Sequence, residues 1–115
     1  MKTLITGGVK SGKSSHALVL AGAFAEPRFF LATAEAFDDE MKEKIARHKA
    51  ERHDRFLTIE EPVAIHECLH ENMILDCIPL WLNNMFHYDR EADIDGTIDA
   101  LLDRLPGNIV IVTNE

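Results

Sequence analysis

Residues 7–15 read GGVKSGKSS and directly follow the short apolar run Leu4-Ile5. The fixed positions of the phosphate-loop pattern GxxxxGK(S/T) are filled by Gly7, Gly12, Lys13 and Ser14. Glycines let the backbone turn tightly and approach a phosphate closely, while loop amides and the following helix N-terminus supply positive potential. The stretch decides the fold, because the pattern requires a strand before it and a helix after it.

The loop predicts a nucleotide site. The residues predicted to bind nucleotide here are Gly7, Gly8, Val9, Lys10, Ser11, Gly12, Lys13 and Ser14. Lys13 is expected to reach the β- and γ-phosphates, and the Ser14 hydroxyl to bind Mg²⁺. Asp76 closes the apolar run 73–75 and is the expected second Mg²⁺ ligand, since an acid after a buried strand often holds the metal in P-loop proteins. The alternative is a glycine-rich turn without a ligand.

Short apolar runs alternate with helical patterns along the chain. The expected strands span 3–6, 28–33, 56–59, 73–76 and 108–113, and the expected helices span 13–24, 38–52, 62–70, 79–86 and 94–105. The runs at 73–75 and 109–112 are continuously apolar, which is typical of strands buried on both faces of a parallel sheet. The sequence therefore predicts one α/β domain over residues 1–115, with a mostly parallel sheet flanked by helices. An apolar strand at the very end favours a chain that is incomplete at its C-terminus.

The composition of the chain argues against nucleic acid, a disulfide framework and a membrane span. The chain has 115 residues and a net charge of −8. An acidic surface repels the phosphate backbone, so nucleic-acid binding is not expected. Cys68 and Cys77 make no disulfide framework, which favours a reduced, cytoplasmic setting. No run approaches the ~20 apolar residues of a membrane span.

The expected helix 38–52 carries the candidate acceptor. Three acids at 38–40 suit the start of a helix, where the dipole favours negative charge. Its spacing of i, i+4, i+7 and i+11 puts four residues on one face: Met41, Ile45, His48 and Arg52. From spacing alone, a solvated helix position explains His48 better than catalysis does.

Four blocks, in this order, resemble one family: TGGVKSGKSSHA at 6–17, DDEMKEKIARHKAER at 38–52, DCIPLWLNN at 76–84 and IVTNE at 111–115. The chain resembles the bifunctional adenosylcobinamide kinase / adenosylcobinamide-phosphate guanylyltransferases of cobalamin biosynthesis. That family usually follows HxxxR with Pro and then Trp, where this chain has His53 and Phe56. Pro79 also stands where the family usually has a threonine or a similar residue.

The resemblance implies a P-loop, RecA-like fold and two reactions. With a nucleoside triphosphate (GTP or ATP), such an enzyme phosphorylates the terminal hydroxyl of adenosylcobinamide. It then takes GMP from GTP onto a histidine and passes it to adenosylcobinamide phosphate. The matching histidine is His48, with Lys13 and Arg52 as further catalytic residues and Glu60 or Glu61 as a nucleotide-facing acid. The resemblance also implies a homo-oligomer, a trimer with sites between subunits, and further strands and helices beyond the VTNE block.

Two other enzyme readings and one inert reading stay open. The segment HECLH at 66–70 satisfies HExxH, which on a helix would place His66 and His70 for zinc with Glu67 as general base. A simple P-loop small-molecule kinase would use the loop and leave His48 structural. A non-catalytic nucleotide-binding piece is the third alternative.

Overall fold

The computed structural model describes residues 1–6, 13–52 and 55–113. Five strands of four residues form one sheet in the order β1-β5-β4-β2-β3. Every pair of neighbouring strands is parallel, which confirms the predicted α/β class. The strands are β1 (Lys2–Ile5), β2 (Phe29–Ala32), β3 (Leu57–Glu60), β4 (Met73–Asp76) and β5 (Ile109–Val112).

Helices connect the strands, as parallel pairing requires. They are α1 (Lys13–Ala21), α2 (Asp39–Arg52), α3 (Ile78–His87) and α4 (Ile94–Asp103), with 3₁₀ turns η2 (Ile65–Glu67) and η3 (Glu91–Asp93). Helix α1 ends at Ala21 rather than at the predicted Phe24. The Ala23 and Phe24 amides bond three residues back, to Leu20 and Ala21, so the last turn tightens and closes the helix.

The predicted helix over 62–70 is wrong, because only the 3₁₀ turn η2 forms there. The backbone N–H groups of Val63 and Ala64 both donate to one carboxylate oxygen of Glu61, at 3.0 and 3.1 Å. These bonds hold the chain in a tight turn just where Pro62 had suggested the start of a helix. The remaining residues are too few to continue beyond a single turn before β4 begins.

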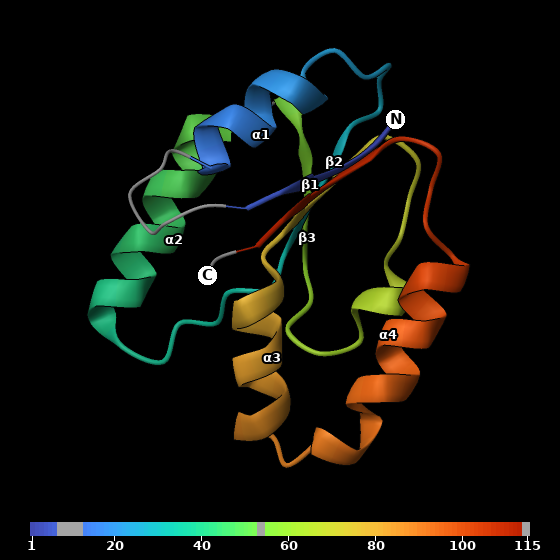
Figure 1. Cartoon of the computed structure of the whole chain (residues 1–115). Helices are drawn as coiled ribbons and strands as arrows, with labels where there is room; N and C mark the ends of the chain where they lie inside the picture. The colour runs from blue at the N-terminus through green and yellow to red at the C-terminus, as the bar shows by residue number, and fades with distance from the viewer. Residues whose placement is uncertain (7–12, 53–54, 114–115) are drawn as a thin grey trace.

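The two faces of the sheet are covered by different helices (Figure 1). Helix α1 packs on β4 and β5, and the core on this face is formed by Ile5, Ala17, Ala21, Phe24, Phe30, Phe56, Ile74, Cys77, Val110 and Val112. On the opposite face α3 and α4 cover a second core formed by Leu31, Ile65, Met73, Leu75, Trp81, Met85, Leu101 and Ile109. Alternate residues of each central strand thus enter different cores, which explains their unbroken apolar sequence.

The second core also holds the loop that follows β3. Trp81 is 1% exposed, and its indole N–H donates to the carbonyl of Val63 at 2.8 Å. This single bond satisfies the only polar group of the indole while the ring fills the core. No helix in the described part of the chain combines the length and apolar character needed to cross a lipid bilayer.

Leu75 provides a test of this packing. It is 0% exposed at the centre of the sheet, whereas Leu102 on α4 is 60% exposed. We expect Leu75→Ala to lower the free energy of unfolding by about 3 kcal/mol, since it removes buried methyl groups and leaves a cavity. Leu102→Ala should change it by less than about 0.5 kcal/mol. Urea denaturation of both variants compares them, and equal losses would contradict the assignment of the core.

Candidate active site

The carboxyl ends of all five strands lie at one level. The ladder pairs Ile5 with Val112, Val112 with Asp76, Asp76 with Ala32, and Ala32 with Glu60. Residues at one level of a sheet point to the same face, and Ile5, Val112 and Ala32 pack in the core beneath α1. The carboxylates of Asp76 and Glu60 therefore project toward the α1 side, from strands separated only by β2.

The segment predicted to bind phosphate falls between the end of β1 and the start of α1. Helix α1 begins at Lys13, so the predicted strand and helix lie before and after this segment. The residues predicted to contact phosphate at 7–12 lie outside the described residues: Gly7, Gly8, Val9, Lys10, Ser11 and Gly12. The side chains of Lys13 and Ser14 lie outside them as well, and their roles stay predictions.

Helix α2 presents one face to the rest of the protein. Among its described side chains the least exposed are Met41, Ile45, His48 and Arg52, and the others are exposed. This confirms the face predicted from their spacing. The helix is also tied to the outer strand β3, because the ammonium of Lys49 lies 3.0 Å from the carboxylate of Glu60. His48 is thus half-buried on the inward face of α2, and its transfer role stays a prediction.

Arg52, the predicted phosphate ligand, packs against the sheet. Its side chain is buried, and its guanidinium carbon lies 3.7 Å from the ring centroid of Phe30. One guanidinium nitrogen donates to the hydroxyl of Thr58 at 3.3 Å. In this arrangement Arg52 anchors the C-terminal turn of α2 to β2 and β3 through a cation–π contact and a hydrogen bond. Phosphate binding by Arg52 stays a prediction.

The two adjacent acids after β3 have different surroundings. Glu60 is exposed and pairs with Lys49, and its predicted contact with nucleotide is untested. One carboxylate oxygen of Glu61 accepts hydrogen bonds from the backbone N–H groups of Val63 and Ala64. Its local role is therefore to shape the turn, and of the two acids Glu60 is the one left facing the carboxyl edge.

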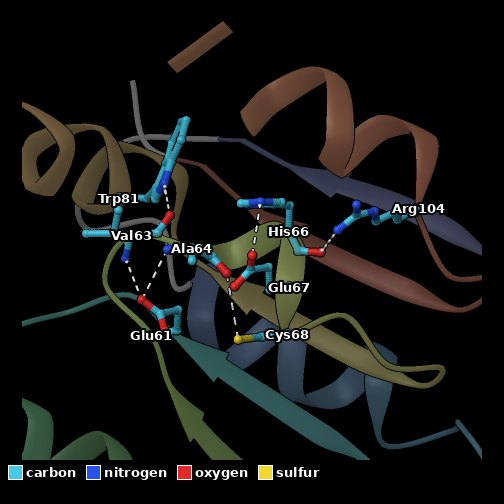
Figure 2. A network of polar contacts seen from close by, with 8 residues as sticks. All are labelled: Glu61, Val63, Ala64, His66, Glu67, Cys68, Trp81 and Arg104. Atoms are coloured by element: carbon cyan, nitrogen blue, oxygen red, sulfur yellow. Dashed lines mark hydrogen bonds and ion pairs between the residues drawn. The ribbon is translucent and has the colours of Figure 1, made fainter. Parts of the chain in front are cut away.

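The HECLH segment does not form the helix that a zinc protease motif requires. Figure 2 shows His66, Glu67 and Cys68 around η2, with Arg104 of α4 donating to the carbonyl of His66. His70 lies beyond the turn and stacks on Phe29 with ring centroids 4.3 Å apart. In the ranges 1–6, 13–52 and 55–113, no group of three His, Cys, Asp or Glu side chains could hold a metal ion.

The thiol of Cys68 belongs to the same turn. It donates to the carbonyl of Ala64 at 3.7 Å. Burial raises the pKa of this thiol, and the nearby carboxylates of Glu61 and Glu67 raise it further. Reactive cysteines have a lowered pKa, so the raised pKa of Cys68 disfavours its thiolate.

Two polar residues that the sequence did not mark as important join the strand ends. Thr33 follows β2 and is fully buried, and its hydroxyl bonds with both the N–H and the C=O of Cys77. Asn84 of α3 donates to the carbonyl of Thr33 at 2.7 Å. Asn84 lies in the block 76–84 that carries the family resemblance, but no role was predicted for it, and no pattern pointed to Thr33.

The loop from β2 to α2 is held at the end of α3. The hydroxyl of Tyr88 donates to the carboxylate of Glu35, and the ring of Phe37 lies 4.4 Å from that of His87. These contacts bind the segment before α2 to the C-terminal end of α3. Helix α2 carries His48.

An all-parallel sheet flanked by helices, with the sequence GxxxxGKS between β1 and α1, defines an α/β protein of the P-loop NTPase type. The profile of the family described as cobinamide kinase / cobinamide phosphate guanyltransferase matches residues 3–115. The chain belongs to this family of enzymes.

Three similar proteins carry names that fit this family. The chain is 40% identical over 124 residues to the bifunctional adenosylcobalamin biosynthesis protein CobP of Pseudomonas aeruginosa, covering 100% of this chain and 72% of the relative. It is 32% identical over 137 residues to the bifunctional adenosylcobalamin biosynthesis protein CobU of Escherichia coli, covering 75% of that protein. The protein with the same name from Salmonella typhimurium is 31% identical, with the same coverage.

The Tyr88–Glu35 bond can be tested by titration. The hydrogen bond to Glu35 raises the pKa of Tyr88 above its ordinary value near 10, and desolvation and the charge of Glu35 act in the same direction. Glu35→Gln should lower that pKa, because the phenolate would no longer face a carboxylate. Tyr88 is the only tyrosine, so the absorbance of its phenolate gives the titration directly. An unchanged titration in Glu35→Gln, with Glu26→Gln as control, would show that the bond does not form.

Proposed function

We propose that this protein is a nucleotide-dependent transferase of cobalamin biosynthesis. It phosphorylates the terminal hydroxyl of adenosylcobinamide, takes GMP from GTP onto His48, and passes GMP to adenosylcobinamide phosphate. The observation that carries the proposal is the alignment of Asp76 and Glu60 at the carboxyl edge, on the face where α1 begins. The names of the relatives and of the matched family supply the two reactions.

The triphosphate is held by the loop between β1 and α1. Loop amides and the N-terminus of α1 favour its negative charge, and Lys13 contacts the β- and γ-phosphates. Such concentrated local potential allows a chain with a net charge of −8 to bind an anion. A competition experiment between GTP and ATP would identify the triphosphate preferred in the kinase step.

Mg²⁺ fits the residues at this edge. Magnesium is commonly held by one or two carboxylates together with substrate phosphates and water. Asp76 at the end of β4 and the hydroxyl of Ser14 supply hard oxygen ligands of the required kind, and the phosphates complete the set. An ion held by Asp76 and Ser14 would supply positive charge beside the phosphates during transfer.

His48 acts as a nucleophile. A neutral imidazole nitrogen attacks the α-phosphorus of GTP, a P–N bond forms, and the bond to the β-phosphate oxygen breaks to release pyrophosphate. A phosphate oxygen of adenosylcobinamide phosphate then attacks the same phosphorus. The P–N bond breaks, the imidazole is restored, and the nucleotide is joined to the corrinoid through a diphosphate.

Assembly is part of the proposal. Helix α2 contacts β2 and β3 of its own subunit through Arg52 and Lys49, and His48 on the same helix is half-buried. A homo-oligomer, a trimer by family resemblance, is proposed, and sedimentation measurements test it.

Transfer through His48 predicts a covalent adduct. Incubation with GTP labelled in its α-phosphate should label the protein with a bond that is acid-labile and alkali-stable, as a phosphoramidate is. His48→Asn should abolish labelling, because the nucleophilic nitrogen is lost. His70→Asn, an exposed position that contacts Phe29 and not α2, is the matched control and should label normally.

The alternatives give other outcomes. Phosphorylation of adenosylcobinamide with no adduct would support a simple P-loop kinase. Failure of the chain to bind GTP or ATP would support a non-catalytic piece. Labelling that survives in His48→Asn would exclude His48 as the acceptor.

The phosphate loop predicts a second effect. Lys13→Ala should weaken GTP binding at least tenfold, because a hydrogen bond to a charged group contributes about 1.5–3 kcal/mol. Lys44→Ala, an exposed position on α2, removes an equal charge and should bind GTP as the unmodified chain does. Calorimetric titration measures both, and equal affinities for the two variants would argue against a phosphate site at Lys13.

A further inference from the structure

A buried hydroxyl joins β2 to β4 just past their last paired residues. Thr33 follows β2, is 0% exposed, and donates its backbone N–H to the carbonyl of Asp76 at 3.0 Å. Its hydroxyl donates to the carbonyl of Cys77 at 2.8 Å and accepts from the N–H of Cys77 at 3.0 Å. The carbonyl oxygen of Asp76 lies 3.3 Å from the same hydroxyl. The threonine side chain therefore continues, beyond Asp76, the pairing that the strands no longer provide.

Asn84 holds the backbone of Thr33 from the side of α3. Its side chain is 2% exposed, and its amide nitrogen donates to the carbonyls of Thr33 at 2.7 Å and Pro62 at 3.0 Å. The side-chain NH₂ of Asn84 thus uses both of its donors on carbonyls in the segments that follow β2 and β3. We call Thr33, Cys77 and Asn84 the Thr33 clamp, which ties together the exits of β2, β3 and β4 and the second turn of α3.

We propose that Thr33 is a positioning residue for the carboxylate of Asp76, and that the Thr33 clamp sets how much Mg²⁺ the protein needs to bind a nucleoside triphosphate. This inference rests on the proposed function, in which Asp76 holds Mg²⁺. An aspartate has a single methylene between backbone and carboxylate, so its oxygens move with its own backbone. The clamp bonds the peptide groups on the C-terminal side of Asp76, where the ladder ends. Mutation of groups that orient a metal ligand commonly costs 10–100-fold in metal affinity.

A purely structural role makes a different prediction. Two buried backbone groups of Cys77 need partners, and the hydroxyl supplies them. If that were its whole purpose, loss of the hydroxyl would lower stability but leave the Mg²⁺ requirement of the folded protein unchanged. The two roles are separated by measuring nucleotide binding as a function of Mg²⁺.

The test compares Thr33→Val with Thr97→Val. Valine keeps the shape of threonine and removes the hydroxyl, and Thr97 is a similarly buried threonine on α4, 8% exposed and outside the candidate site. Binding of α,β-methylene GTP, which cannot transfer GMP, is measured by calorimetry over a series of Mg²⁺ concentrations and in EDTA. We expect Thr33→Val to raise the half-saturating Mg²⁺ concentration by about 10-fold, with little change in EDTA. Thr97→Val should match the unmodified chain.

A double-mutant comparison adds a second measurement. In an Asp76→Asn background the carboxylate is absent, so Thr33→Val should cause no further change in the Mg²⁺ requirement. Thr33→Ser keeps the hydroxyl and should restore the normal requirement. Should Thr33→Val not fold, Thr33→Cys, with a weaker hydrogen-bonding group of similar size, should shift the requirement in the same direction by a smaller factor.

The outcomes separate this inference from the proposed function. A chain that binds the analogue in a Mg²⁺-dependent manner, with the same dependence in Thr33→Val and Thr97→Val, overturns the inference and leaves the proposed function standing. A Thr33→Val variant that loses affinity equally with Mg²⁺ and in EDTA also overturns it. Failure of the unmodified chain to bind the analogue at any Mg²⁺ concentration overturns both.

Discussion

The hydrogen-bond ladder of the parallel sheet is the constraint on which the site depends. It pairs β1 with β5, β5 with β4, β4 with β2 and β2 with β3 without a shift at their carboxyl ends. A slip of one residue in β4 would turn Asp76 to the opposite face, away from α1. The same slip would exchange the side chains that Ile74 and Leu75 place in the two cores, so the packing on both faces favours the register that orients Asp76.

Much of the fold was predictable from the sequence, and for physical reasons. The apolar runs that end at Asp76 and at Val112 are too continuous for a half-exposed strand, and β4 formed over the predicted residues. The sheet-facing side of α2 also followed the predicted spacing through His48 to Arg52. Periodicity and strand burial reflect local sequence, so a single chain is enough to predict them.

Errors arose where a side chain overrides a local pattern. Pro62 suggested a helix, but the carboxylate of Glu61 takes the amides of Val63 and Ala64 and makes a turn instead. The importance of Thr33 was invisible, because its partners Cys77 and Asn84 lie 44 and 51 positions further along the chain. The contact between the guanidinium of Arg52 and the ring of Phe30 was likewise not predicted, and the role of Arg52 at a phosphate stays a prediction. Long-range contacts of single polar groups leave no periodic trace in a sequence.

The indole of Trp81 gives the molecule an intrinsic optical reporter. It is the only tryptophan, it is buried between α3 and the sheet, and its N–H is bonded to the turn that follows β3. Its fluorescence therefore reports on the contact between α3 and the turn that Glu61 forms after β3. Any motion that separates these two segments would hydrate the ring and shift its emission to the red. Loosening of the carboxyl edge of the sheet can therefore be followed in solution without an added dye.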